Sequence, residues 1–438
     1  MRAELIFIPS PGVGHLVSSI EVAKLIASRD EQISISILIM KMPFDSGIVA
    51  FTQNLKKDAP ERIAFIDIPD LDDTTRTELM SLPQTSFFTS YIESQRTLVR
   101  DIVATILEQS ESAKIGGFVI DMFCTSMIDV ANEFNVPAYV FFTSGAAFLS
   151  LMFFIQTLKD NESKEISEYK DSDVELSIPG FINPLPVKVL PSMMVTKDGS
   201  AFIVGIARRL REAKAILVNT VWELEAHSIK SLADDENTPL IYHVGPIISF
   251  TTGGETTDKK KSEEDIVCWL NCQPPLSVVY LCFGSWGSFN KEQVTEMAQA
   301  LELSGQRFLW SLRRPSQETE KMKPPTDYED FNEVLPEGFL ERTSGIGKLV
   351  KELGIAVEIK TDYGKDHFTN TESAEVLTAD VIERGIRCLM DGESQVRSKM
   401  KEMKGKCREA TGGAGSSYTS LGQFIGAVMD NIQEEAFN

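Results

Sequence analysis

The sequence lacks the features of membrane-spanning and nucleic-acid-binding proteins. None of its apolar runs reaches the roughly 18 residues that a helix needs to cross a bilayer. Basic residues are outnumbered, with 43 Lys and Arg against 64 Asp and Glu and a formal net charge of −21. Because a nucleic-acid surface needs a cationic face for the phosphates, we expect neither a transmembrane segment nor a nucleic-acid partner.

Cysteine and histidine are also scarce, with 6 and 4 residues in a chain of 438. The cysteines are scattered and several lie within apolar runs, which is typical of reduced thiols in a cytosolic protein. Cys268 and Cys272 lie four residues apart, but no second pair of cysteines or histidines completes a zinc site. We therefore predict a cytoplasmic protein that holds no metal.

Strands and helices are predicted to alternate along the first half of the chain. The predicted helices occupy residues 13–27, Ser86–Gln109 and Thr125–Phe134. The predicted strands, all short, apolar and rich in β-branched or aromatic residues, are residues 4–8, Ile33–Met40, Ile63–Ile68, Gly116–Asp121, Ala138–Thr143 and Ala215–Thr220. This alternation is typical of an α/β domain with a doubly wound parallel sheet.

The second half repeats the order of strand, glycine turn and helix at residues 277–304. Further strands are predicted at Arg307–Leu312 and Ile355–Ile359, and further helices at Thr378–Met390 and from Ser394 onward. This makes about three strands, fewer than the five to six of an average sheet.

A stretch rich in Thr, Gly and charge, residues 251–265, shows no periodicity and is typical of a linker. We therefore predict a first domain at 1–247, a linker at 248–264, a second domain at 265–419 and a C-terminal helix at 420–438.

His15 is the most informative single residue. It follows a predicted strand and a Pro-Gly-Val-Gly turn, at the carboxyl edge of the sheet where open α/β folds bind ligands. Because a helix N-terminus disfavours the imidazolium cation, we expect a neutral His15 that can accept a proton. Asp121 ends another strand, and at the same edge its carboxylate would bind the second imidazole nitrogen. Taken singly, the alternatives are a helix-capping histidine and a solvated aspartate.

Two glycine turns are candidates for binding phosphate or sugar through backbone amides. Gly12 and Gly14 resemble the start of a dinucleotide fingerprint, but Val17 stands where the third glycine belongs, so we expect no nicotinamide site. Gly284 and Ser285 follow the apolar run VVYLCF, and small residues there let amides approach a phosphate. A tight turn with helix-capping serines is an equal alternative.

Aromatic residues recur near the predicted carboxyl edge. Phe88, Phe123 and Phe148 are candidates to line a pocket for a large aromatic substrate. Ordinary core packing is the alternative for each of them.

Several longer stretches together carry a family resemblance over nearly the whole chain. They are FIPSPGVGHLVSSIEVAKLI, FVIDMFCTSMIDVANEFNVPAYVFFTSGAAFL, AILVNTVWELE, YHVGPII, VVYLCFGSWGSF, LPEGFLERTSGIGK, VKELGIAVEIKTDY and VIERGIRCLMDGESQVRSKMKEM. The chain resembles the plant family 1 UDP-dependent glycosyltransferases. The resemblance implies two Rossmann-like domains in the GT-B arrangement, with the acceptor bound mainly in the first and the nucleotide sugar mainly in the second.

The resemblance also implies an activity and a set of roles. A sugar, with glucose as the first candidate, would pass with inversion and without a metal from a UDP-sugar to a hydroxyl or carboxyl of a hydrophobic small molecule such as a phenolic, flavonoid or terpenoid. The residue matching His15 takes the acceptor proton, and the residue matching Asp121 orients it. Gly14 matches the catalytic loop, Thr143 a position on the donor sugar, and Ser285, beside Gly284, a position near the donor phosphates.

The resemblance is interrupted after SGIGK, residues 344–348. The family's donor-binding block, which begins Trp-Ala-Pro-Gln and contains His-Cys-Gly-Trp-Asn-Ser, is absent, and the family pattern resumes at Leu349. About 50 residues, nearly two βα units, are missing. We therefore expect a second domain that is incomplete after Lys348, and weak or lost binding of the UDP-sugar. A non-catalytic small-molecule binder or a defective splice product is the alternative to an active enzyme.

Overall fold

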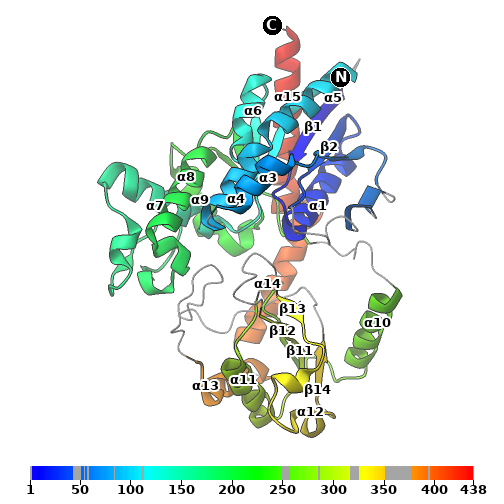
Figure 1. Ribbon diagram of the computed structural model, residues 1–438, viewed down its shortest axis with the longest axis vertical. Helices are drawn as coiled ribbons and strands as arrows, with labels where there is room; N and C mark the ends of the chain where they lie inside the picture. Colours follow the sequence, from blue (N-terminus) through cyan, green and yellow to red (C-terminus); the bar gives the residue numbers. More distant parts are fainter. Residues whose placement is uncertain are drawn as a thin grey trace. The chain divides into compact units, whose positions relative to one another are not determined.

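The chain forms two compact units, each described by itself below (Figure 1). The first comprises Met1–Val187, Met194–Gly254 and Met403–Asn438, and the second comprises Lys188–Met193 and Glu255–Glu402. The structure, a computed structural model, describes residues 2–42, 51–53, 55–56, 59–82, 84–109, 113–248, 257–284, 287–315, 325–350, 376–392 and 395–437.

The first unit is built on a parallel seven-stranded sheet. In spatial order its strands are β3 (Ile63–Asp67), β2 (Ile33–Ile39), β1 (Arg2–Ile8), β4 (Ala113–Asp121), β5 (Ala138–Phe142), β8 (Ala215–Val218) and β9 (Leu240–His243). The strand order reverses between β1 and β4, so the carboxyl ends of these two strands form the switch point at which doubly wound sheets bind ligands. The predicted fold class is confirmed for this unit.

Helices and short turns connect these strands. They are α1 (Val13–Arg29), α3 (Asp73–Met80), α4 (Gln84–Ser94), α5 (Arg96–Gln109), α6 (Met127–Glu133), α7 (Ala146–Glu162), α8 (Lys197–Leu210), α9 (Trp222–Asp234) and α15 (Ser416–Phe437). A short antiparallel pair, β6 (Glu175–Leu176) and β7 (Leu185–Pro186), lies between α7 and α8. The helix predicted over Ser86–Gln109 is two helices, α4 and α5, because the chain turns at Gln95 and buries that side chain.

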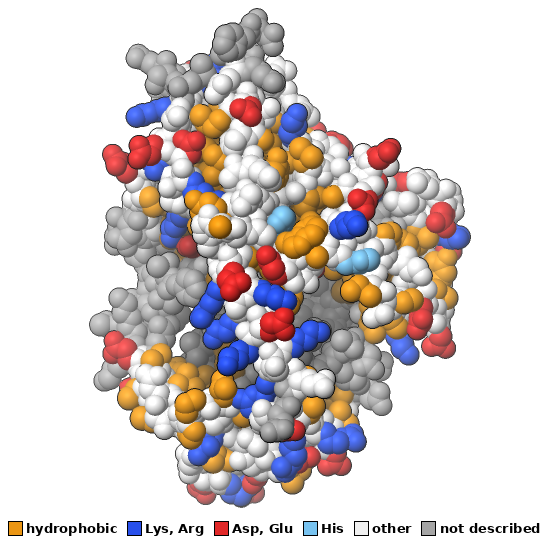
Figure 2. All heavy atoms as spheres, turned by 180° about the vertical axis from the view of Figure 1, so that it is seen from behind, with side chains coloured by type: hydrophobic (Ala, Val, Ile, Leu, Met, Phe, Trp, Pro, Cys, Tyr) orange, Lys and Arg blue, Asp and Glu red, His pale blue; other side chains and the backbone are white. Residues whose placement is uncertain are grey.

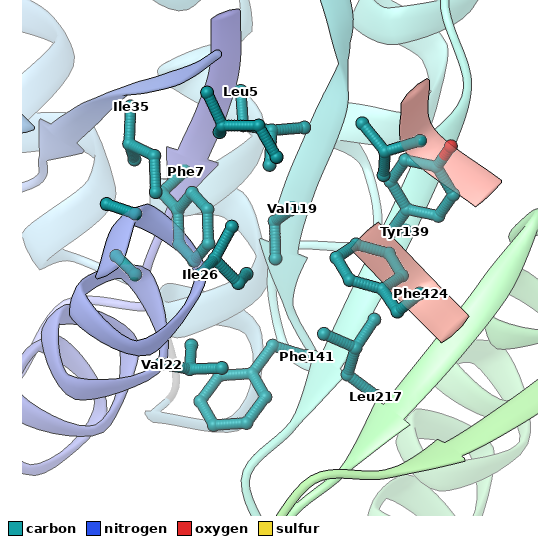
Figure 3. Close-up of a cluster of buried hydrophobic side chains, with 14 of the residues drawn as sticks. Leu5, Phe7, Val22, Ile26, Ile35, Val119, Tyr139, Phe141, Leu217 and Phe424 are labelled. Atoms are coloured by element: carbon teal, nitrogen blue, oxygen red, sulfur yellow. The ribbon is translucent and has the colours of Figure 1, made fainter. Parts of the chain in front are cut away.

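One hydrophobic cluster of the first unit lies between the sheet and the helices α1 and α15 (Figure 3). Side chains of β1, β2, β4, β5 and β8 project toward these helices, as Phe7 and Phe141 illustrate. Helix α15 buries one face at helical spacing, Leu421, Phe424, Ile425, Val428 and Ile432. The last helix of the chain therefore belongs to the core of the first unit.

The second unit contains a smaller parallel sheet, β10-β11-β14. Its elements are α10 (Thr257–Asn271), β10 (Val278–Leu281), α11 (Lys291–Ser304), β11 (Arg307–Ser311), β12 (Arg313–Arg314), β13 (Thr326–Asp327), α12 (Phe339–Arg342), β14 (Gly347–Val350) and α13 (Ala379–Met390), and α14 (Gln395–Thr411) leads from this unit into the first. Helices α11 and α13 cover Phe308 and Trp310 of β11, and Ile266 of α10 packs against Leu309. The Gln293 amide on α11 bonds both backbone groups of Leu377, which leads into α13.

Several boundaries differ from the sequence-based expectation. Residues 403–419 group with the first unit rather than the second. They lead into or begin α15, which packs on β4 and β9 of the first unit. The predicted linker ends earlier than expected, since α10 begins at Thr257. Strand β9 was not predicted, and the predicted strand Ile355–Ile359 lies outside the described residues.

The face drawn in Figure 2 carries charged side chains of both signs, and the acidic and basic ones are interspersed. Within the described part of the chain, no helix combines the length and the apolar character that a membrane span requires.

Candidate functional site

His15 is placed at the switch point by the turn between β1 and α1. Gly12 caps this helix with φ of 122°, a left-handed conformation that favours glycine, and its carbonyl accepts from the Leu16 amide at 3.1 Å. His15 is therefore the third residue of α1, directly beyond the end of β1. Asp121 is the last residue of the neighbouring strand β4.

The two side chains are in contact, as the sequence predicted. His15 Nδ1 lies 2.8 Å from Asp121 Oδ2. The Asp121 side chain is fully buried, whereas 30% of the His15 side chain is exposed. The other carboxylate oxygen accepts from the Phe123 amide at 3.0 Å, and the Cys124 amide donates to the Asp121 carbonyl at 2.8 Å. The aspartate is thus fixed by its own turn, and among the described residues His15 Nε2 has no hydrogen-bond partner.

The pKa of His15 is raised, which is opposite to the direction that a helix N-terminus alone predicts. Burial lowers the pKa of His15, but the charge of Asp121 and the hydrogen bond to it raise that pKa by more, and the net shift is upward. The nearby carboxylate therefore outweighs burial, and it makes His15 a stronger base. Cys124, the other titratable group beside Asp121, stays a neutral thiol because burial raises its pKa.

A group of aromatic rings begins at His15. The Phe123 ring meets the imidazole edge-on at 5.5 Å between centroids, and Phe88 of α4 meets Phe123 edge-on at 5.7 Å. Phe202 of α8 stacks on Phe123 at 6.3 Å. Phe148, the third predicted lining residue, has its ring contact with Phe142 instead. The sequence analysis missed Phe202, whose only signal was a lone aromatic residue in an amphipathic helical pattern.

The segment after β5 carries Thr143, and α9 secures it. Thr143 Oγ1 lies 3.5 Å from His15 Nδ1. Three residues on, α7 begins, and its first amides, of Ala146 and Ala147, donate to the Glu225 carboxylate at 2.8 and 3.0 Å. Gly145 leaves room for this carboxylate, because a Cβ there would lie 2.7 Å from Glu225 Oε2. Glu225 was not singled out from the sequence.

The other predicted donor-binding residues are divided between the two units. Gly14 lies in the first turn of α1, next to His15. Gly284 follows β10 in the second unit with φ of 72°, a left-handed conformation suited to a tight turn. Ser285 lies outside the described residues.

Solved structures match this chain over almost its whole length. A glycosyltransferase from Siraitia grosvenorii in complex with UDP is 34% identical with a TM-score of 0.83, covering 98% of this chain and 100% of that one. The Medicago truncatula enzyme UGT71G1 complexed with UDP-glucose is 33% identical with a TM-score of 0.81, covering 98% of both chains. The fold is therefore that of the glycosyltransferases of the GT-B class.

Similar sequences lead to the same family. A UDP-glucose flavonoid 3-O-glucosyltransferase from Fragaria ananassa is 43% identical, with 98% of this chain and 99% of the relative covered. UDP-glycosyltransferase 71A15 from Malus domestica is 40% identical over 97% of this chain and 99% of the relative. No protein-family model matches. The chain belongs to the plant UDP-glycosyltransferases.

Proposed function

We propose that this chain transfers a sugar, with glucose as the candidate, from a UDP-sugar to a hydroxyl or carboxyl of a hydrophobic small molecule such as a phenolic, flavonoid or terpenoid. The observation that carries this proposal is the His15–Asp121 contact of 2.8 Å, with the Phe123 ring beside the imidazole and no hydrogen-bond partner for Nε2 among the residues that the structure describes. The strawberry relative is named for glucosylating a flavonoid, which supports the acceptor class.

The proposed chemistry is a single displacement with inversion. His15 Nε2 takes the proton of the acceptor hydroxyl while the oxygen attacks the anomeric carbon. A new bond forms between that oxygen and carbon, the bond to the diphosphate breaks, and its electron pair leaves with UDP. Asp121 balances the charge that develops on the imidazole, as a buried carboxylate does in other His–Asp pairs. The reaction as proposed needs no metal, because the base is a side chain.

On the donor side, Gly14, Thr143, Gly284 and Ser285 are proposed contacts by family resemblance, and we propose that binding there is weak or lost. The alignment with the strawberry relative runs over 488 positions, whereas this chain has 438 residues, so at least 50 aligned positions have no residue of this chain opposite them. This supports an internal deletion, which we place after Lys348. Without the aromatic, carboxylate and helix-end contacts of a donor block, little offsets the cost of ordering a nucleotide sugar.

A non-catalytic small-molecule binder is the second candidate, and the same alignment favours it. Such a chain would arise as a defective splice product. Both readings keep the aromatic acceptor site of the first unit. We also propose a cytoplasmic location, which the six free thiols support.

Turnover and binding measurements on the full chain separate these readings. The chain is incubated with UDP-glucose and a panel of phenols, flavonoids and terpenoids, beside His15→Ala and, as a matched control, His227→Ala, which alters an exposed histidine. A β-glucoside formed by wild type and His227→Ala but not by His15→Ala supports transfer. Saturable acceptor binding without product, and no calorimetric signal for UDP, supports the binder.

A graft then tests the deletion itself. The donor block of the strawberry relative is inserted after Lys348. UDP binding that appears only with the insert supports the proposed loss, whereas tight UDP binding by the chain without the insert refutes it.

A further inference from the structure

The Thr143 hydroxyl lies between two side chains of the candidate site. Its Oγ1 is 3.5 Å from His15 Nδ1 and donates to Met122 Sδ at 3.7 Å. We propose that Thr143 is a positioning residue for His15, whose hydroxyl is a second acceptor for the Nδ1 proton beside Asp121. This deepens the proposed function and rests on it, because it assumes that His15 works through Nε2.

The directions of these hydrogen bonds follow from what each group can donate. An ionised carboxylate only accepts, so the short contact between His15 and Asp121 requires the proton on Nδ1. Thr143 Oγ1 then cannot donate to the same nitrogen, and it offers a lone pair. Its own proton is directed to the Met122 sulfur, which is a weak acceptor. One N–H is therefore shared between a short, charged acceptor and a long, neutral one.

Both partners of the imidazole are held by the sheet. Asp121 and Phe141 are paired residues of β4 and β5, and the Met122 amide donates to the Phe141 carbonyl at 3.2 Å. Thr143 follows β5 directly, and the Glu225 carboxylate caps the helix that starts three residues later. Because neither partner can follow the imidazole if it turns, rotation of the His15 ring would lose both contacts.

This arrangement has a measurable consequence for His15. An acceptor on the Nδ1 proton stabilises the imidazolium and the neutral tautomer with a free Nε2. Among the described residues, Asp121 is the charged group that acts on His15, and burial opposes it. The Thr143 contribution adds to that of Asp121 and is smaller, because a neutral contact of 3.5 Å is at the weak end of hydrogen bonds. We expect about 0.4 pKa unit, equivalent to about 0.5 kcal/mol.

The test is an NMR titration of His15 in the full chain with labelled histidine. With four histidines in the sequence, the His15 signal is assigned by its loss in His15→Gln. Thr143→Val keeps the shape and removes the hydroxyl, and Thr143→Ser keeps the hydroxyl. We expect a lower His15 pKa and a larger fraction of the Nε2-protonated tautomer in the valine variant, and wild-type values in the serine variant. Thr143→Ala replaces the valine variant if the latter does not fold.

Two outcomes overturn the proposal. One is a folded valine or alanine variant with an unchanged His15 pKa and tautomer. The other is a serine variant that shifts as much as the valine variant. The titration uses no donor or acceptor, so a chain that fails every transfer assay can still pass this test, and the two failures are distinguishable.

Discussion

Replacing Phe424 with alanine should destabilise the first unit and leave the second unaffected. Phe424 lies on the buried face of α15, is 0% exposed, and meets Tyr139 and Tyr242 edge-on at centroid distances of 5.0 and 5.6 Å. Burying an aromatic side chain of about 170 Å² at about 25 cal/mol per Å² gives roughly 4 kcal/mol. Measured losses for Phe→Ala in cores, about 3–5 kcal/mol, agree with this figure. The expected loss of unfolding free energy is therefore about 4 kcal/mol.

The assay must report on each unit separately. Hydrogen exchange measured by mass spectrometry along a urea series follows peptides from β4 and β9 for the first unit and from β11 for the second. With a slope of about 3 kcal/mol per M, the first unit should open at a urea concentration lower by about 1.3 M. Gln423→Ala, on the exposed face of the same helix, is the matched control and should shift neither unit. A Phe424→Ala shift equal to that of Gln423→Ala would refute the placement of α15 in the first core.

Three further predictions concern the candidate site. Asp121→Asn should drop the His15 pKa below its ordinary value in an NMR titration, because burial is then unopposed; an unchanged pKa contradicts the assigned pairing. The His15 pKa is raised in the folded state, so the pair's contribution to stability is full below the unfolded pKa of about 6.5 and is lost as pH rises through the folded value. The difference in unfolding free energy between wild type and Asp121→Asn, measured in urea, should accordingly become smaller from acidic to alkaline pH. A difference that does not change with pH would contradict this prediction. Glu225→Ala should lower the stability of the start of α7 by about 1–2 kcal/mol, because the amides of Ala146 and Ala147 lose their hydrogen-bond acceptor. Hydrogen exchange at the start of α7 measures this loss, and unchanged exchange contradicts the prediction.

Periodicity and strand-end position predicted much of the first unit. The apolar runs at β1, β4 and β5 are easily distinguished from the turn residues beside them. Because the strands are parallel, their carboxyl ends lie at one edge of the sheet. The contact between His15 and Asp121 follows from that geometry although 106 residues separate them. The side-chain pairing needed only two strand assignments, both of which hold in the structure.

Other features depend on tertiary contacts that leave little mark on the sequence. Strand β9 is half exposed at the sheet edge and begins with a Leu240 that is 64% exposed, so it lacks the buried pattern of its neighbours. Helix α15 has a clear amphipathic face, but nothing local indicates that the face packs on the distant β4. In the sequence, Glu225 looks like any acidic residue near the start of a helix, and only the structure shows that it accepts from the first amides of α7. The upward shift of the His15 pKa was not predicted, because a local helix effect was considered without the charge of Asp121.

The structure also bears on whether acceptor and donor binding must be lost together. The dyad, the Phe123 ring, its neighbour Phe202 and the Glu225 cap all lie in the first unit. That unit closes its core with α15, which comes from the far end of the chain, so its integrity needs residues beyond any deletion after Lys348 but not the deleted residues themselves. The proposed deletion, if it keeps the reading frame, leaves α15 in the core of the first unit, whereas a truncation at the same point would remove this helix. Acceptor affinity measured without a donor is for this reason the quantity that separates a chain with a weakened donor site from one that has lost its fold.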